Sequence, residues 1–366
     1  MEMNENFKIK IKVVGVGGGG NNMIEHLQSN YLQDFDHDYI ELISVNTDAQ
    51  VLANSKAKTI AIGTKLTGGL GAGMRPETGR LAAEENYEEL VEGLRGANMV
   101  FIACGMGGGT GTGAAPVIAR AAKEVGALTI SIATKPFSFE GRKRKRFAVE
   151  GLRELENTTD SLIVIENDKL LKTANSNLAF KMAFKMVDNV LAKAVQGIIG
   201  IILDSGNNDI NVDFADLKTI LSYSGYSVMS MAVGIGENAA VEAVEKALTN
   251  QLLSYSDISG SKGVLIHFAA SSSYPLDKLY EAMNMIEDKA DEDADIIFGT
   301  STTDMEESEV AVTLIATGFK TTNEEETNIK KIEEVKTDNI QTSFEYKKNN
   351  NLDEEQPNVL RLTIKG

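Results

Sequence analysis

The sequence is poor in the residues that carry redox and thiolate chemistry. It contains one cysteine, Cys104, and three histidines among 366 residues. A single cysteine can form no internal disulfide and is too few for a thiolate metal site. We therefore predict that Cys104 is a small, buried, apolar side chain at the end of a strand, and the composition argues against redox chemistry.

Long apolar runs and clustered positive charge are also scarce. No stretch approaches the length that crosses a bilayer, and the N-terminal segment MEMNENFKIKIK lacks the apolar core and cleavage site of a secretory signal. The formal net charge of -17 argues against nucleic-acid or anionic-membrane partners, because both bind clustered lysine and arginine. These features predict a cytoplasmic protein with no direct membrane insertion.

The alternation of apolar, strand-like segments with helical segments predicts an α/β fold. Several have the continuous apolar pattern of strands buried on both faces of a sheet. Helical patterns lie between them, such as residues 114–126, with Pro116 near the start and Gly126 just past the end. This alternation predicts a Rossmann-like parallel sheet with helices on both faces. The predicted strands lie within residues 7–16, 39–48, 96–105, 127–136 and 159–168 of the first half, and within 262–271, 294–301 and 309–319 of the second.

A long amphipathic segment divides the chain. Residues 175–203 keep apolar side chains at three- and four-residue spacing, which predicts one long helix that must be covered from two sides. We expect a first α/β domain at 1–174, the central helix at 175–204 and a second α/β domain at 205–319. The apolar stripe of the helix consists of Leu178, Met182, Val187, Leu191, Val195 and Ile198.

The composition changes after Phe319. Residues 320–350 are rich in Asn, Glu, Lys and Thr, which predicts a disordered linker. Apolar residues return in EEQPNVLRLTIKG, within residues 351–366, and a short apolar motif on a flexible tether is typical of a docking peptide. A frayed tail without a partner is the alternative.

Two glycine-rich segments, at 15–20 and 105–113, each follow a buried strand and precede a helix. Each presents backbone N–H groups and the positive end of the next helix, a combination that cradles phosphate oxygens. Two cradles predict a polyphosphate ligand in the first domain. Thr110 and Thr112 add hydroxyl donors for a phosphate oxygen or for the water shell of Mg2+.

Other interpretations of these segments stay open. Gly15-x-Gly17-x-x-Gly20 also fits a dinucleotide-binding fingerprint with Asp48 on the ribose, although that leaves the second segment unexplained. No Gly-Lys-Ser or Gly-Lys-Thr follows either segment, so a Walker loop is absent. The basic run GRKRKR, 141–146, is either a targeting signal or a solvated loop that contacts a phosphate.

Several motifs resemble those of the FtsZ family of bacterial cell-division GTPases, in the tubulin superfamily. GMGGGTGTGAAPVIA resembles the signature loop of the superfamily. VVGVGGGGNN, VNTDAQ, GLGAG, KPFSFEGRKR, ENDKLL, AVQGI and NVDFAD are similar to FtsZ motifs in the same order. The resemblance covers residues 9 to about 319, and the tail peptide 355–361 is similar to the family's C-terminal docking peptide.

The resemblance implies that residues 1–174 form a nucleotide-binding domain, with a set of contacts with GTP or GDP and Mg2+. Glu140 would hold the ribose, and Arg144 would approach the phosphates. Asn167 and Phe184 would border the base, where a carboxylate on the long helix would accept from guanine N1–H and N2–H2, a donor pair that adenine lacks. The implied contacts in the glycine-rich segments are Gly18, Gly19, Gly20, Asn21, Asn22, Gly107, Gly108, Gly109, Thr110, Gly111, Thr112 and Gly113.

The chain departs from the family's pattern at three places. The family commonly has Asp before Val-Leu on the long helix, but here the order is Asp188-Asn189. Either Asp188 substitutes for that carboxylate or Asn189 reads guanine differently. SGNNDI, 205–210, is longer than the family's loop, and Met74-Arg75 replaces smaller residues. We expect these two differences to alter loop shape and longitudinal contact while the reaction type is unchanged.

The catalytic groups are expected outside the nucleotide-binding domain, because none of the three histidines lies in a glycine-rich segment. In the family, the NVDFAD loop of one subunit reaches the nucleotide of its neighbour. The resemblance therefore implies that Asp213 and Asp216 polarise water, with Asn211 nearby. The sequence alone favours a plainer role, with Asp213 capping a helix and Asp216 in its first turn. The two roles are compatible.

Together these inferences predict a GTPase that polymerises head to tail at the mid-cell division site and hydrolyses GTP between subunits. Residues 355–361 would tether the filament to membrane-adaptor and other division proteins. One alternative is a nicotinamide-dependent oxidoreductase, which binding of NAD without GTP would favour. Another is a slow, structural tubulin-like filament that serves DNA segregation, against which the two acids and the docking-like tail argue.

Overall fold

The computed structural model describes residues 9–30, 39–173, 179–203, 210–223, 225–249, 258–303 and 305–319. The predicted linker and docking peptide lie outside these residues. So do Leu178 and all but the last residue of SGNNDI.

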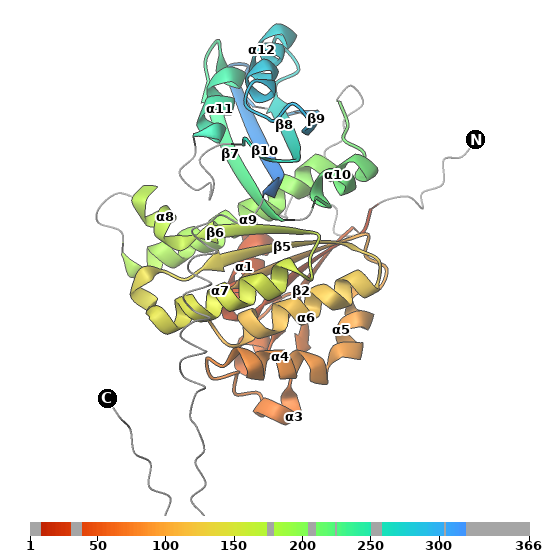
Figure 1. Cartoon of the computed structure of the whole chain (residues 1–366), viewed down its shortest axis with the longest axis vertical. Helices are drawn as coiled ribbons and strands as arrows, with labels where there is room; N and C mark the ends of the chain where they lie inside the picture. The colour runs from red at the N-terminus through yellow and green to blue at the C-terminus, as the bar shows by residue number, and fades with distance from the viewer. Residues whose placement is uncertain are drawn as a thin grey trace, which may run out of the picture. The chain divides into compact units, whose positions relative to one another are not determined.

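The described residues form a sheet of ten strands in the order β3-β2-β1-β4-β5-β6-β7-β10-β8-β9 (Figure 1). Neighbouring strands pair in parallel except β10, which runs antiparallel to both β7 and β8. The α/β prediction is therefore confirmed. The strands are β1 Ile11–Val16, β2 Ile40–Asn46, β3 Lys58–Ala61, β4 Met99–Gly105, β5 Leu128–Lys135, β6 Ser161–Glu166, β7 Tyr226–Ile235, β8 Gly263–Ala270, β9 Asp295–Thr302 and β10 Glu309–Phe319.

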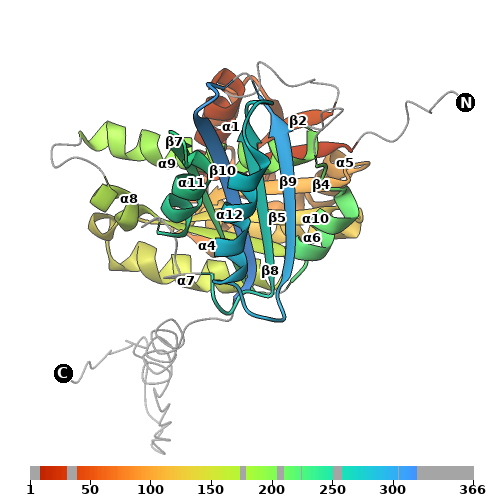
Figure 2. The same cartoon turned by 90° about the horizontal axis from the view of Figure 1, so that it is seen from above.

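Helices cover the sheet on both faces. In the first half, α1 and α9 pack on one face of β1, β4 and β5, and α4 to α7 pack on the other. In the second half, α11 and α12 cover β7, β8 and β10 (Figures 1 and 2). The helices are α1 Gly17–Asn30, α2 Ala49–Ala53, α3 Thr64–Thr67, α4 Pro76–Glu85, α5 Tyr87–Leu94, α6 Thr110–Glu124, α7 Arg142–Glu156, α8 Asn167–Thr173, α9 Phe180–Leu203, α10 Phe214–Leu221, α11 Ala239–Leu248 and α12 Leu276–Glu287, with a 3-10 turn at Ser138–Glu140.

Strand β4 lies at the centre of the first half and is buried almost throughout, as its continuous apolar sequence predicts. Cys104 is fully buried near its end, and burial raises the pKa of the thiol to about 12. The prediction of a small, buried cysteine at the end of a strand is confirmed. In the part of the chain that the structure describes, no helix is both long and apolar enough to span a bilayer.

Helix α9 joins the two halves of the sheet. Its buried side chains, including Leu191 and Val195, share one core with Ile130 of β5 and Leu217 of α10, so the helix is covered from two sides as predicted. The predicted stripe is wrong at Met182, which is 49% exposed. The buried stripe passes through the adjacent Ala183 instead, one turn before Val187.

The basic run 142–146 is not a loop. It forms the start of α7, directly after Gly141. The φ of Gly141 is 100°, a backbone conformation that favours glycine and lets the chain turn into the helix. Arginine and lysine are good helix formers, but consecutive cations are unfavourable at the positive end of a helix. Ion pairs from outside the helix offset this cost, because Arg144 pairs with Glu140 and Lys145 lies 3.6 Å from Asp168.

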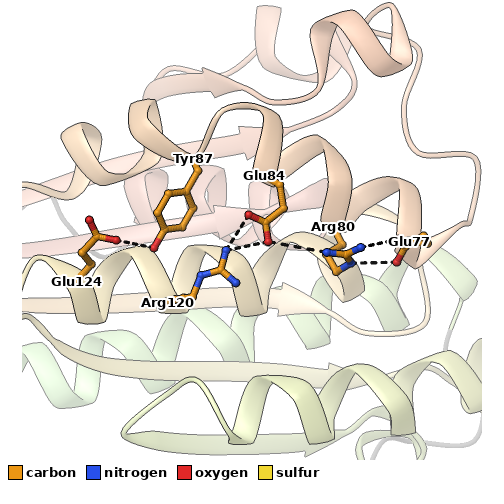
Figure 3. Close-up of polar contacts among 6 residues, drawn as sticks. All are labelled: Glu77, Arg80, Glu84, Tyr87, Arg120 and Glu124. Carbon is orange, nitrogen blue, oxygen red and sulfur yellow. Dashed lines mark hydrogen bonds and ion pairs between the residues drawn. The ribbon is translucent and has the colours of Figure 1, made fainter.

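Helices α4 and α6 approach so closely that only glycine fits at their contact. A Cβ on Gly113 would lie 1.9 Å from the carbonyl oxygen of Pro76, and one on Gly79 would lie 2.3 Å from that of Gly109. A chain of polar contacts crosses the surface of α4, α5 and α6 (Figure 3). Its members are Glu77, Arg80, Glu84, Tyr87, Arg120 and Glu124.

Candidate nucleotide-binding site

The order of the strands reverses between β1 and β4, which are neighbours in the sheet. Helix α1 begins immediately after β1, and α6 begins at Thr110, shortly after β4. Two glycine-rich helix N-termini therefore lie side by side beyond the carboxyl ends of adjacent parallel strands. In open α/β sheets this switch point is where ligands bind, and helix N-termini favour anions.

The two glycine-rich segments touch through their backbones. A Cβ on Gly17 would lie 2.9 Å from the amide nitrogen of Gly111, and one on Gly20 would lie 2.3 Å from the carbonyl oxygen of Ala103. In contrast, Gly18 and Gly108 have open space, with no atom within 4 Å of an added Cβ. The segments thus brace each other at their bases and leave room at their tips for a ligand.

Hydrogen bonds of buried and half-buried polar side chains hold the two glycine-rich segments in this arrangement. Asn21 donates to the carbonyl oxygen of Gly15 over 2.8 Å and accepts from Asn46 over 2.7 Å. Thr112 accepts from the amide of Gly107 over 2.8 Å, and the hydroxyls of Thr47 and Thr110 are 2.7 Å apart.

These contacts divide the residues that the resemblance implies. Asn21 and Thr112 are buried supports, whereas Gly18, Gly19 and Asn22 are exposed. Gly107, Gly109, Gly111 and Gly113 are buried, and Gly108 and Thr110 are half-buried. The exposed backbone at the tips of the two segments is therefore the part that is open to a phosphate.

The segment after β5 places Glu140 and Arg144 together. Glu140 accepts from the amide of Phe137 over 2.9 Å, and its second oxygen pairs with the Arg144 guanidinium. The backbone of Arg144 also packs against the phosphate segment, because a Cβ on Gly107 would lie 2.8 Å from its carbonyl oxygen. Arg144 is therefore adjacent to the second glycine-rich segment, and the side chains of Arg144 and Glu140 satisfy each other.

The side of the site formed by β6 and α9 carries the residues expected around a base. Asn167 follows β6 and is buried, and its Oδ1 atom has no hydrogen-bond partner within the described ranges. The ring of Phe184 packs edge-on against Phe137, with centroids 5.2 Å apart. Asn189 lies 3.3 Å, from Oδ1 to Nε2, from His26 of α1.

Asp188 is half-buried on the same helix. Burial raises the pKa of its carboxyl group from 3.8 to about 6, although the charge of His26 opposes the shift. A carboxyl whose folded-state pKa is raised stabilises the fold only while it is protonated, so this contribution is lost as the pH rises from about 4 to about 6.

We therefore expect Asp188→Asn to stabilise the nucleotide-free protein at about pH 7.5, by about 1 kcal/mol after solvent screening is allowed for. Urea unfolding at several pH values measures the difference. It should disappear near pH 4, where the wild-type carboxyl is protonated in both folded and unfolded chains. A difference that is constant with pH would contradict the prediction.

The predicted catalytic residues lie in the second half of the chain. Asp213 caps α10, since its Oδ1 atom accepts from the amide of Asp216 over 2.7 Å, so the capping prediction is confirmed. Asn211, Asp213 and Asp216 are all exposed. The preceding residue Ile210 pairs with Thr300 of β9 through two hydrogen bonds of 2.9 and 3.0 Å.

The structure does not bring these acids to the glycine-rich segments. Across the described ranges, neither Asp213 nor Asp216 has a hydrogen bond or ion pair with a residue of the nucleotide site. Nor does any group of three His, Cys, Asp or Glu residues in these ranges form a metal-binding cluster.

Sequence reasoning missed the supporting roles of Asn46, Thr47 and His26. The motif VNTDAQ contains Asn46 and Thr47. Their place at the end of a buried strand was the sequence signal that could have indicated a supporting role. Asp48, the ribose ligand of the dinucleotide alternative, accepts from the amide of Gln50 over 2.9 Å and caps α2. No comparable sequence signal marks His26.

This parallel sheet, with two glycine-rich helix N-termini at its switch point and a long helix leading to a second α/β half, defines a GTPase of the tubulin type. Residues 10–175 match the model of the Tubulin/FtsZ family GTPase domain, and residues 225–320 match that of the FtsZ family C-terminal domain. The chain belongs to the Tubulin/FtsZ family. It is therefore a GTPase that binds GTP and GDP, and the oxidoreductase alternative is set aside.

Solved structures agree with this assignment. The chain is similar to an FtsZ dimer from M. jannaschii, described as empty, with 42% identity, coverage of 86% of this chain and 89% of that chain, and a TM-score of 0.78. It also shares the fold of CetZ2 from Haloferax volcanii, described as a GTPγS-bound protofilament, with 20% identity, coverage of 90% and 99%, and a TM-score of 0.77. The bacterial origin that the resemblance implies stays a prediction.

Proposed function

We propose that this GTPase assembles head to tail and hydrolyses GTP at the junction, where Asp213 and Asp216 of one subunit approach the nucleotide held by the next. The main observation in support of this proposal is that the two acids lie apart from the glycine-rich segments of their own subunit. Both acids are exposed at the start of α10. A carboxylate that polarises water must lie within hydrogen-bond reach of it, so these acids act on a nucleotide that another subunit supplies.

Exposed apolar side chains on unlike parts of the chain support such a contact. Leu70, 84% exposed, belongs to the segment that bridges to Asp48, and Phe139, 57% exposed, precedes Glu140. In the second half, Leu276 and Tyr280 are 73% and 69% exposed one turn apart on α12. A contact between unlike faces leads to open filaments, and the CetZ2 relative is described as a protofilament.

On binding, the nucleotide would replace some of the contacts that the site residues make with one another. The exposed amides of the two glycine-rich segments would bind phosphate oxygens, with the N-termini of α1 and α6 behind them. A ribose hydroxyl would donate to Glu140 in place of Arg144, and the released guanidinium would pair with phosphate. Water aligned by Asp213 and Asp216 would then attack the terminal phosphorus while its bond to the bridging oxygen breaks, which releases GDP and inorganic phosphate.

Mg2+ would complete the site as a ligand of the nucleotide. Mg2+ is usually held by one or two carboxylates together with substrate phosphates and water, and this fits a chain with exposed acids and glycine-rich cradles. Its chemistry would be to neutralise the charge that develops on the phosphates. The exposed carboxylates of Asp213 and Asp216 are the protein oxygens available to it from the neighbouring subunit.

We further propose a place for the filament in the cell. The family resemblance supports a cytoplasmic filament at the mid-cell division site, in the division ring. The tail peptide 355–361 would bind membrane-adaptor and other division proteins, without insertion of this chain into the membrane. The tail lies outside the described residues, so this part rests on its sequence.

A mixing experiment tests the shared site. Asp213→Asn keeps its own nucleotide cradle, whereas Gly108→Asp adds a negative charge to the open tip of the cradle and keeps its acids. Each variant alone should have almost no GTP turnover. In a mixed filament about one junction in four pairs an intact cradle with intact acids, so activity should return to as much as about a quarter of wild type.

Phosphate release measures the recovery, and co-pelleting of the two variants, one of them tagged, shows that they share filaments. Wild-type turnover per subunit should also rise above a threshold concentration. A mixture that co-pellets but stays as inactive as its components would show that each subunit hydrolyses its own nucleotide and would overturn the proposal.

A further inference from the structure

Strand β9 holds the segment 210–213, which leads into α10. β9 is the last strand in the order of the sheet, so among the described strands only β8 pairs with it. The amide of Thr300 in β9 donates to the carbonyl oxygen of Ile210 over 3.0 Å. The Thr300 hydroxyl accepts from the amide of Ile210 over 2.9 Å. Thr300 therefore pairs with both backbone groups of a residue that lies three positions before Asp213.

The preceding residue, Gly299, lets the segment lie directly against the strand. A Cβ on Gly299 would lie 2.7 Å from Cγ2 of Val212 and 3.1 Å from the carbonyl oxygen of Ile210. Val212 is buried in the core that also contains Leu217 and Ile220 of α10. The path of the segment is thus fixed by two hydrogen bonds at one residue and by close packing at the next.

Helix α10 is attached to the same half of the sheet at its C-terminal end. Thr317 of β10 donates from its hydroxyl to the carbonyl oxygen of Ile220 over 2.8 Å. The Tyr223 hydroxyl, just past the end of the helix, donates to Asp295 of β9. Contacts at both ends therefore set the orientation of α10, and with it the orientation of the exposed acids at its start.

The position of the two acids depends on this backbone. Across the ranges that the structure describes, neither carboxylate forms an ion pair, and Asp213 Oδ1 caps the helix. A group that orients a reacting water must be placed accurately, because a displacement of about 1 Å can lower a rate by about 100-fold. A residue that fixes segment 210–213 therefore contributes to turnover even from a distance.

We propose that Thr300 is a positioning residue for GTP hydrolysis, which acts through Ile210 to hold Asp213 and Asp216 toward the nucleotide of the neighbouring subunit. The inference rests on the proposed function, because it requires these acids to act at the junction. The hydroxyl is the critical group. Valine has nearly the same shape as threonine but offers no acceptor to the Ile210 amide, whereas serine keeps that acceptor.

The test measures phosphate release by the full chain at saturating GTP, with GDP affinity and pelleting in parallel. Thr300→Val should lower kcat by about 10-fold through misplaced acids. Its GDP affinity should stay within about 2-fold of wild type, because the glycine-rich segments are unchanged. Thr300→Ser should recover most of the turnover. Gly299→Ala, which pushes the segment away from β9, should lower kcat at least as much as Thr300→Val.

Tyr223→Phe is the matched structural control. It also removes a hydroxyl hydrogen bond to β9, but at a position two turns beyond Asp216. Its kcat should stay within about 2-fold of wild type. Thermal unfolding of each variant shows whether it is folded.

Mixed filaments show which part of the shared site Thr300 serves. Thr300→Val keeps its cradle, so mixing it with Gly108→Asp, which keeps well-placed acids, should return turnover to about a quarter of wild type. Mixing it with Asp213→Asn should give no gain, because neither variant then supplies well-placed acids. Co-pelleting with one variant tagged shows that the two share filaments.

Each result has a defined meaning. Wild-type turnover in Thr300→Val, no recovery in Thr300→Ser, an equal loss in Tyr223→Phe, or no gain with Gly108→Asp would overturn the inference. The shared site would survive any of these results as long as Asp213→Asn alone is inactive. Wild-type turnover in Asp213→Asn would instead contradict the proposed function itself. If Thr300→Val fails to fold, Gly299→Ala replaces it in the same mixtures.

Discussion

Asp213→Asn is expected to lower GTP turnover by about 100-fold or more while the protein still forms sedimentable filaments. Asparagine caps helix N-termini as well as aspartate does, so the hydrogen bond to the amide of Asp216 and the stability of α10 should be retained. The substitution removes only the negative charge that we propose orients water and shares the charge of a bound metal. Phosphate release at saturating GTP, with pelleting in parallel, measures the effect.

The cap offers a control that separates structure from catalysis. Asp213→Ala removes both the cap and the charge, and should cost a further 1 kcal/mol or so of stability in urea unfolding. If the carboxylate acts only as a cap, Asp213→Asn will turn over GTP like wild type and only the alanine variant will be impaired. Asp216→Asn, in the first turn of the same helix, should also lose turnover but leave the cap unaffected.

The parts of the fold that sequence reasoning predicted have strong local signals. Buried parallel strands such as β4 are continuous apolar runs, and the glycine-rich segments after β1 and β4 mark the phosphate side of the sheet. The Asp213 cap is equally local, because it depends on residues three positions apart. The order of β1 and β4 in the sheet, which creates the switch point, is not a local property.

The features that escaped prediction depend on distant partners. The start of α7 contains consecutive cations, which local rules place outside a helix start, but Glu140 and Asp168 compensate them from outside the helix. Strand β7 was also missed, since one side of its second half is exposed and its apolar pattern is weak. The hydrogen bond between His26 and Asn189 joins positions far apart in sequence and has no sequence signature.

The contact between α4 and α6 shows how distant partners decide the role of a glycine. Sequence reasoning assigned Gly113 to the phosphates, as part of the glycine-rich run. The structure places it in the body of α6, where its Cα faces the backbone of Pro76 and Arg80. The polar contacts across the surface in Figure 3 are exposed and contribute little, so close backbone packing holds α4 against α6.

Gly113→Ala is therefore expected to destabilise the protein by about 3 kcal/mol, although alanine is the better helix former by about 1 kcal/mol. The added methyl group would lie 1.9 Å from the carbonyl oxygen of Pro76 and 2.6 Å from the amide nitrogen of Arg80. Both are backbone atoms, so relief requires α4 to move as a whole. Urea unfolding of the nucleotide-free chain measures the loss.

Gly108→Ala is the matched control, because a Cβ there meets no atom within 4 Å. It should leave the free energy of unfolding within about 0.5 kcal/mol of wild type and lower GDP affinity, since the methyl group occupies the space left for phosphate. Wild-type stability in Gly113→Ala would mean that α4 can move away from α6 at little cost. The two variants thus separate glycines that pack helices from glycines that make room for the nucleotide, within a single run of sequence.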